Sequence, residues 1–178
     1  MAKRLVDLQP RERRRVVLVS LMKVAAAWVL VLGAYALTPD RSTSGAMVFA
    51  RLVLDLVIVV SLVAWLTRSI INAAFPQVAA AEALGVIAVV FVALFAGIYL
   101  MLDSSGSPAF SQRLDHVRAL YMTVTVLSTV GFGDIVARTN TARILVTIQM
   151  VLDLVLIGAV VRLLFMAASH GLNRAAKD

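Results

Sequence analysis

The sequence predicts an all-α membrane protein with four transmembrane helices and one short helix that enters the membrane without crossing it. Of its 178 residues, 61% are hydrophobic and only 15% are charged, a composition that suits lipid better than a soluble core. The third observation is how the apolar residues are arranged. Crossing a hydrocarbon core of about 30 Å takes about 20 helical residues, and four apolar runs are long enough: 16–37, 47–66, 82–102 and 142–166.

The first two runs follow a basic segment, and this charge pattern predicts the topology. Residues 1–15 carry six basic side chains, whereas the loop at 38–45 carries only Arg41. Lysine and arginine accumulate in cytoplasmic loops, so we expect the N-terminus in the cytoplasm. Four crossings return the tail, 168–178, to the same side. Residues 16–66 would then form two accessory transmembrane helices, and 67–81 a cytoplasmic linker in which Pro76 breaks the helix.

The formal net charge of +7 indicates contact with membrane lipid rather than with nucleic acid. The basic residues cluster outside the apolar runs, where they act as topology signals, and the N-terminal arginines could bind anionic lipid. The chain has no cysteine and two histidines, His116 and His170, which are too distant in sequence to form a metal motif. We therefore expect neither an enzyme nor a resident cofactor.

The third and fourth runs are separated by a segment unlike either of them. Residues 103–113, DSSGSPAFSQR, are polar and contain turn formers, which predicts an extracellular loop. Residues 115–128, DHVRALYMTVTVLS, start with an acidic helix-start residue and become apolar. A helix of this length is about 21 Å long at 1.5 Å per residue, too short to cross. Backbone that stops at membrane depth needs protein or water around it, so the segment predicts a re-entrant helix.

Residues 129–134 read TVGFGD, and this signature segment resembles the selectivity filter of the potassium channel family. In that family an outer helix, a turret, a pore helix, the filter and an inner lining helix follow in this order, and residues 82–167 have the same order and similar lengths. The run Asp134-Ile135-Val136 and Arg143 also resemble bacterial members. The resemblance implies a pore domain at 82–167, with the pore helix at 115–128, the filter at 129–134 and the inner helix at 142–166.

Physical chemistry gives a reason for the glycines of the signature segment. Carbonyls that replace the hydration shell of K⁺ must all point to one axis, whereas an ordinary strand alternates them. Gly131 and Gly133 can adopt positive φ without steric cost, so alternation with Val130 and Phe132 would turn every carbonyl inward. Thr129 would add its hydroxyl. We therefore expect K⁺ at Thr129, Val130, Gly131 and Phe132, with the side chains of 130 and 132 wedged outward.

One chain supplies one such strand, so a closed ring of carbonyls predicts a homotetramer with the conduction path on its four-fold axis. The resemblance implies that Tyr121 of the pore helix supports Asp134, and we hypothesise a hydrogen bond between them. Phe132 stands where tyrosine is commoner in the family. This difference removes a hydroxyl that usually braces the filter.

Asp153 is the most unusual residue of the fourth run, because it lies near the middle of the membrane. Intramembrane carboxylates usually face a polar cavity or a partner. Two alternatives stay open: a cavity-facing ring of four that attracts cations, or a hydrogen bond between helices. In the family this position is often a flexible glycine, so Gly158 could supply the bend instead. Arg162 is a further candidate at an intracellular gate.

The sequence therefore predicts a passive potassium-selective channel of the plasma membrane, with both termini cytoplasmic and K⁺ as the transported ion. Two alternatives differ from this hypothesis. One is a weakly selective cation channel, and the other is a non-conducting membrane scaffold or accessory subunit.

Overall fold

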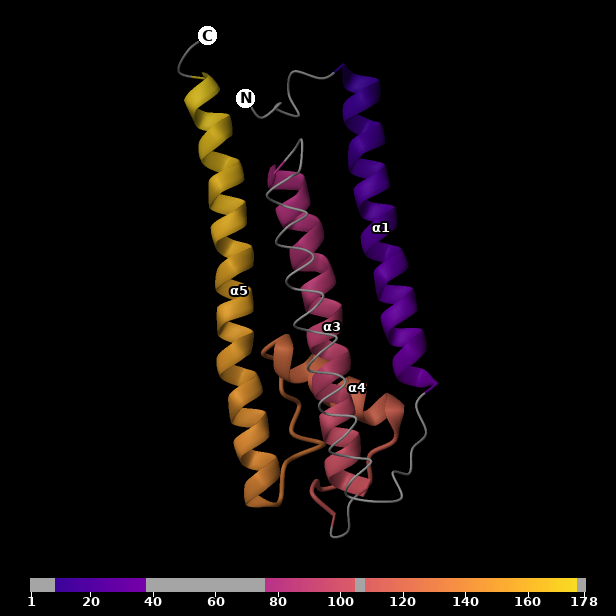
Figure 1. Ribbon diagram of the computed structural model, residues 1–178. Helices are drawn as coiled ribbons and strands as arrows, with labels where there is room; N and C mark the ends of the chain where they lie inside the picture. Colours follow the sequence, from indigo (N-terminus) through magenta and orange to yellow (C-terminus); the bar gives the residue numbers. More distant parts are fainter. Residues whose placement is uncertain (1–8, 38–75, 105–107, 176–178) are drawn as a thin grey trace.

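The computed structural model describes residues 9–37, 76–104 and 108–175. They form three long helices and one short one (Figure 1): α1 (Pro10–Ala36), α3 (Pro76–Ser104), α4 (His116–Leu127) and α5 (Asn140–Ala175). The second predicted span, 47–66, lies outside the described residues. So do 1–8 of the basic segment, 67–75 of the linker, 105–107 of the loop and 176–178 of the tail.

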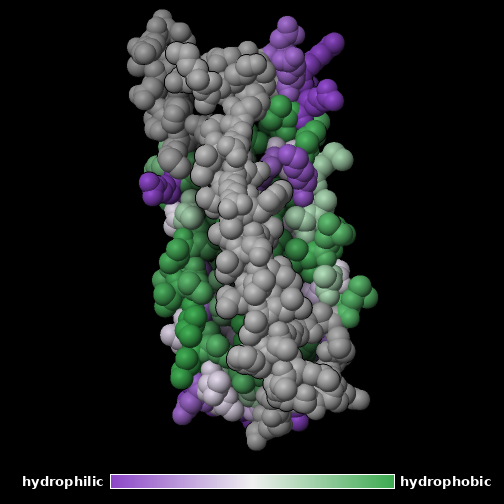
Figure 2. All heavy atoms as spheres, viewed as in Figure 1, coloured by the Kyte–Doolittle hydropathy of each residue, from purple (hydrophilic) through white to green (hydrophobic). Residues whose placement is uncertain are grey.

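The three long helices are apolar and long enough to cross a membrane over Arg14–Ala36, Val78–Ser104 and Asn140–Phe165. In Figure 1, α3 lies between α1 and α5, and α4 lies at the end of the bundle where α1 and α3 end and α5 begins. Hydrophobic residues cover the middle of the described surface, and hydrophilic ones gather towards its two ends (Figure 2). This distribution is typical of a membrane protein.

Two predicted helix starts differ from the structure. Residue Pro76, which we expected to break a helix within the linker, is the first residue of α3. Proline suits the first helical position because its fixed φ is helical and its missing N–H would have no intrahelical partner there. Similarly, α1 begins at Pro10, so Arg11, Arg14 and Arg15 lie in the helix and not in a separate basic segment.

The inner helix is longer than predicted. α5 starts at Asn140, directly after Thr139, whose hydroxyl accepts a hydrogen bond from the backbone N–H of Ala142 at 3.2 Å. This is the usual capping contact at a helix start. The helix continues to Ala175, so most of the predicted tail, 168–178, extends α5 instead of leaving it.

The core lies where α3, α4 and α5 meet. An aromatic ladder runs along α3 and onto the following loop, with ring centroids 4.7 Å apart for Phe91 and Phe95, 6.1 Å for Phe95 and Tyr99, and 5.4 Å for Tyr99 and Phe110. Ala119 and Met122 of α4 and Ala142 and Val146 of α5 pack into the same cluster. Buried aromatic pairs of this kind add packing energy to their area burial.

The accessory helix α1 packs along α3. Gly85 allows a close approach, since a Cβ there would lie 2.8 Å from a methyl group of Val24. The indole N–H of Trp28 donates to the Gly85 carbonyl at 3.1 Å, and Lys23 pairs with Glu82 at 3.5 Å. Near its end, α1 also reaches the short helix α4, where the Tyr35 hydroxyl donates to the carbonyl of His116 at 3.0 Å.

Candidate functional site

The candidate site is the short helix α4 with the signature segment that follows it. α4 has 12 residues, about 18 Å at 1.5 Å per residue, so it cannot cross a bilayer. Its start is fixed by Asp115, whose side chain accepts a hydrogen bond from the backbone N–H of Arg118 at 2.8 Å. The observed bounds, with caps at Asp115 and Ser128, agree with the predicted helix at 115–128.

The C-terminal end of α4 has the hydrogen bonds of a Schellman motif. The N–H of Thr129 bonds to the carbonyl of Val126 at 2.9 Å, and the N–H of Val130 bonds to the carbonyl of Thr125 at 3.1 Å. The N–H of Gly131 reaches the Thr125 carbonyl too, also at 3.1 Å. The motif needs a residue with positive φ directly after the cap, usually glycine. Here Thr129 takes that position with φ 59°.

Backbone φ alternates in sign along the signature segment. Gly131 and Gly133 have φ of 51° and 77°, which confirms the predicted positive φ of both glycines. Thr129 is the only non-glycine residue with positive φ in the described part of the chain, and the sequence analysis missed it. Positive φ in a β-branched residue is a genuine outlier. Such strain persists only where the surroundings hold it, and it is common at functional sites.

The side chains of the signature segment lie partly on the surface of the single chain. Val130 and Phe132 are 54% and 70% exposed. The Phe132 ring stacks on Tyr121 of α4, with ring centroids 6.4 Å apart and an angle of 4° between the planes. This contact places one face of Phe132 against the short helix and leaves the rest of the side chain available to another surface.

Tyr121 and Asp134, predicted as a supporting pair, lie close enough to influence each other. Desolvation raises the pKa of the Tyr121 phenol, and hydrogen bonding to Asp134 and the negative charge of that residue raise it further. Each of these effects disfavours the negatively charged tyrosinate. The phenol therefore stays neutral near neutral pH, as a donor beside the carboxylate must.

The backbone after the signature segment is tied to the loop before α4. Phe110 and Ala137 form an antiparallel bridge, and the N–H of Ser111 donates to the carbonyl of Val136 at 2.8 Å. The side-chain amide of Gln112 donates to the Asp134 carbonyl at 3.0 Å. These bonds hold the segment from both of its ends, since α4 holds its start.

Asp103, which we expected in an extracellular loop, is a buried anchor in the last turn of α3. One carboxylate oxygen accepts from the N–H of Ala109 at 3.0 Å, and the other accepts from the N–H of Leu114 at 2.8 Å. The Arg113 guanidinium donates to the Asp103 carbonyl at 2.9 Å. A carboxylate that accepts two backbone N–H bonds is well satisfied despite burial. Sequence analysis missed this role because both partners lie across a loop.

Asp153 lies inside the subunit, 2% exposed, in a polar cluster that joins three helices. Gln149 donates from its side-chain amide to Asp153 at 3.3 Å and to the Thr123 carbonyl of α4 at 3.1 Å. The Tyr99 hydroxyl of α3 donates to the amide oxygen of Gln149 at 2.5 Å. A ring of cavity-facing carboxylates would need an exposed side chain, whereas Asp153 is buried. Its bond from Gln149 lies within α5, and the bonds that join α5 to α3 and α4 are made by Gln149 and not by Asp153.

The other two candidates on α5, Gly158 and Arg162, take no part in the hydrogen bonds of this polar cluster. Gly158 and Arg162 are both exposed, and a Cβ added at Gly158 would meet nothing within 4 Å. Their predicted parts in bending and gating stay predictions. The structure therefore brings together the six residues of the signature segment and Tyr121, while Asp153, Gly158 and Arg162 stand apart on α5.

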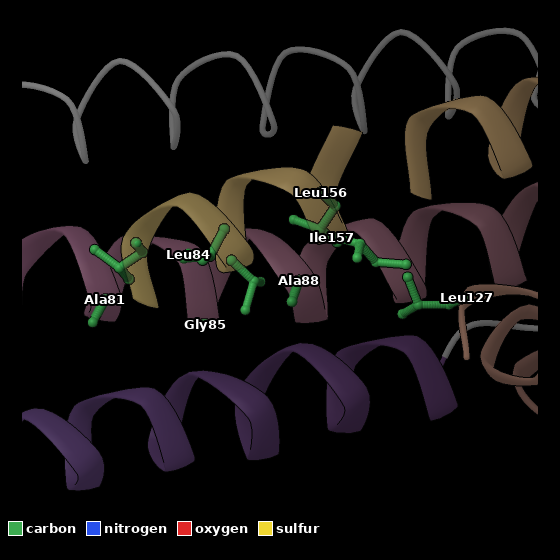
Figure 3. Close-up of a pocket in the computed structure, with 9 residues that line it drawn as sticks. Ala81, Leu84, Gly85, Ala88, Leu127, Leu156 and Ile157 are labelled. Atoms are coloured by element: carbon green, nitrogen blue, oxygen red, sulfur yellow. The ribbon is translucent and has the colours of Figure 1, made fainter. Parts of the chain in front are cut away.

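An apolar cavity of about 370 Å³ lies between α3 and α5. Figure 3 shows its side chains, with Leu127, the last residue of α4, at one end. All nine lining residues are aliphatic or glycine: Ala81, Leu84, Gly85, Ala88, Leu127, Leu156, Ile157, Val160 and Leu163. Coordination of a dehydrated cation needs oxygen atoms. The side chains that line this cavity therefore supply no oxygen ligand for a dehydrated cation.

Residues 87–170 match the model of a family described as ion channel. Searches of curated proteins and of solved structures returned no match. The matched residues take in most of α3, the whole of α4 with the signature segment, and α5 as far as residue 170. The apolar helices and this match together support a membrane protein that carries an ion-channel domain at residues 87–170.

Proposed function

We propose that residues 82–167 form the pore domain of a potassium-selective channel, in which four copies of the chain surround one conduction path. The observation that carries this proposal is the alternating sign of φ at 129–133, with positive values at Thr129, Gly131 and Gly133. Alternation of this kind points successive carbonyls to one side of the backbone, and a ring of such strands supplies oxygen ligands for dehydrated K⁺. K⁺ is the transported ion and passes down its electrochemical gradient.

The homotetramer is supported by what one chain leaves exposed. A single strand cannot encircle an ion, and Phe132 and Val130 are largely exposed on the isolated chain. The membrane-spanning part of α5 is also mostly exposed, and it carries large apolar side chains on several faces. Faces of this size need lipid or other subunits beside them. Four-fold assembly would place α5 as the inner helix and α4 as a pore helix directed towards the axis.

The orientation follows from the proposed pore and the basic residues of α1. Arg11, Arg14 and Arg15 are exposed at the start of α1, at the end of the bundle away from the signature segment (Figure 1). We place this end in the cytoplasm of a cell whose plasma membrane holds the channel, with both termini on that side. The exposed arginines are positioned to contact anionic lipid head groups.

Two measurements on purified protein test the proposal. The mass of the detergent-solubilised particle should correspond to four chains, and liposomes that contain the protein should take up K⁺ when a gradient is imposed. A monomeric particle, or liposomes as tight as protein-free ones, would support a membrane scaffold or accessory subunit instead.

A weakly selective cation channel is the second candidate, and Phe132 favours it. The ring stacks on Tyr121 but has no hydroxyl that could brace the signature segment by a hydrogen bond. A less firmly braced ring of carbonyls would discriminate less between K⁺ and Na⁺. Equal uptake of the two ions by the same liposomes would favour this candidate.

A further inference from the structure

The polar cluster between α3, α4 and α5 contains Gln149, a residue with no role so far in the proposed channel. Gln149 is fully buried in the first third of α5, within a segment long and apolar enough to span a membrane. A buried primary amide in such a place is costly unless its hydrogen-bonding groups are satisfied. The Gln149 amide donates two hydrogen bonds and accepts one, each with a different residue.

The three partners of Gln149 lie on three helices. Its amide oxygen accepts from the Tyr99 hydroxyl of α3, and its amide nitrogen donates to the Thr123 carbonyl of α4 and to the Asp153 carboxylate of α5 itself. Tyr99 and Asp153 therefore fix the plane of the amide from two sides. With its plane fixed, the amide can hold the Thr123 carbonyl at one distance and direction.

The bond to Thr123 lies close to the bonds that shape the signature segment. Thr123 is two residues before Thr125, whose carbonyl accepts the N–H groups of Val130 and Gly131. The Thr123 hydroxyl also donates to the Ala119 carbonyl at 2.9 Å, so its side chain is committed to the helix. A displacement of this turn of α4 would be passed through Thr125 to the backbone of 130 and 131.

We propose that Gln149 is a positioning residue for ion selectivity. It fixes the last turns of α4 against α5 and thereby sets the geometry of the signature segment, while Tyr99 and Asp153 orient its amide. This inference rests on the proposed channel function and deepens it. It makes α5 a support of the filter as well as a lining helix.

Substitution Gln149→Met tests the proposal, because it keeps a similar volume and removes all three hydrogen bonds. The matched control is Val146→Ala, one turn earlier on α5 and in the same buried cluster, which creates a cavity but removes no hydrogen bond. The first readout is hydrogen exchange of peptides that cover residues 125–134 in the full-length assembled protein. The second is the ratio of Na⁺ to K⁺ permeability in planar bilayers.

Loss of these buried hydrogen bonds should raise exchange of the 125–134 peptides by about tenfold in Gln149→Met. The permeability ratio of this variant should rise by about the same factor. Val146→Ala should lower thermal stability and leave both readouts within about twofold of wild type. Equal exchange in the two variants would overturn the proposal.

If Gln149→Met fails to assemble, Tyr99→Phe provides a milder change, since it removes only the hydroxyl that orients the amide. We expect exchange of the same peptides to rise by about threefold, as for the loss of one hydrogen bond. Unchanged exchange in Tyr99→Phe would contradict the orienting role. If the wild-type protein does not distinguish Na⁺ from K⁺, the proposed potassium selectivity is refuted. The positioning role of Gln149 is still tested in that case, because hydrogen exchange does not depend on measuring a current.

Discussion

The N-terminal end of α4 is held by side chains from the preceding loop, α3 and α1, whereas its C-terminal end is held by backbone bonds and one buried amide. At the N-terminal end, Asp115 caps the helix, Asp103 accepts from Leu114, and Tyr35 donates to His116. At the C-terminal end, the Thr125 carbonyl accepts from Val130 and Gly131. The first end is thus anchored by side chains of other elements, and the second is continuous with the signature segment.

We expect changes at the two ends of α4 to affect different properties: stability at the N-terminal end and ion selectivity at the C-terminal end. Contacts at the N-terminal end come from side chains outside the signature segment, so losing one should lower stability without reshaping that segment. At the C-terminal end the same atoms that end the helix shape the proposed filter. A change there should alter ion conduction even where the fold survives.

The largest effect is expected at the C-terminal end, from Gly131→Ala. Gly131 has φ 51°, and an L-residue in the left-handed region costs about 1–2 kcal/mol, repeated in every subunit. A Cβ there would meet nothing within 4 Å in the single chain, so the cost comes from the backbone. We expect potassium uptake by liposomes to be abolished.

The control for Gly131→Ala is Gly97→Ala in α3. A Cβ at Gly97 also meets nothing within 4 Å, but Gly97 lies within a regular helix. Uptake should therefore remain close to that of wild type. Normal uptake in Gly131→Ala would show that the signature segment does not depend on positive φ at this residue.

The next largest effect is expected at the N-terminal end, from Asp103→Asn. One of the two carboxylate oxygens becomes an amide nitrogen, which cannot accept, so a backbone N–H of Ala109 or Leu114 loses its partner. An unsatisfied buried donor costs about 1–3 kcal/mol. Thermal unfolding of the assembled protein should show this loss, while the ratio of Na⁺ to K⁺ permeability stays unchanged. The control is Ser104→Ala, at an exposed residue one position further on. A changed permeability ratio in Asp103→Asn would show that the N-terminal end of α4 also affects selectivity.

A smaller effect is expected for Tyr35→Phe, which removes the hydrogen bond from α1 to the His116 carbonyl of α4 and keeps the aromatic ring. The ring packs edge-on against His116, with centroids 5.1 Å apart. Losing the hydroxyl should cost about 0.5–1.5 kcal/mol and raise hydrogen exchange at residues 114–120. Trp28→Phe, which breaks the bond from α1 to Gly85, should leave exchange at 114–120 unaltered. If neither variant raised exchange at 114–120, the contact of α1 with α4 would not stabilise the start of α4.

Tyr121 offers a test by pH. Its pKa is raised above the ordinary value of 10.0 by desolvation and then by Asp134. A folded-state pKa above the unfolded one gives stability that is fully present below pH 10 and is lost as pH rises through the folded pKa. In Asp134→Asn the pKa of Tyr121 should fall towards its ordinary value. Difference titration of tyrosinate absorbance against Tyr121→Phe measures this shift, and an unchanged titration would mean that the two residues do not interact.

The smallest effect is expected from Asp153→Asn. Asparagine keeps an oxygen that can accept from Gln149, and the buried position gives the carboxylate no access to a cavity. Block by internal Mg²⁺ should therefore be the same in the variant and in wild type. Relief of block would instead support the alternative of a cavity-facing carboxylate ring.

Local patterns in the sequence predicted the bounds of α4 and the positive φ of Gly131 and Gly133, because capping residues and glycines act on their own backbone. Thr129 was missed, since threonine gives no local signal for a left-handed conformation and adopts it here as part of the helix end. The bonds of Gln149 were missed for another reason. They join residues 26 and 50 positions apart, and such contacts depend on how the helices pack.

The reversal potential of the wild-type protein in a planar bilayer, with K⁺ on one side and Na⁺ on the other, tests the central claim most directly. If carbonyls at 129–133 replace the water around K⁺, the reversal potential will be large and of the sign that a potassium-selective pore requires. A reversal potential near zero would mean that the two ions pass equally well, and it would contradict the account.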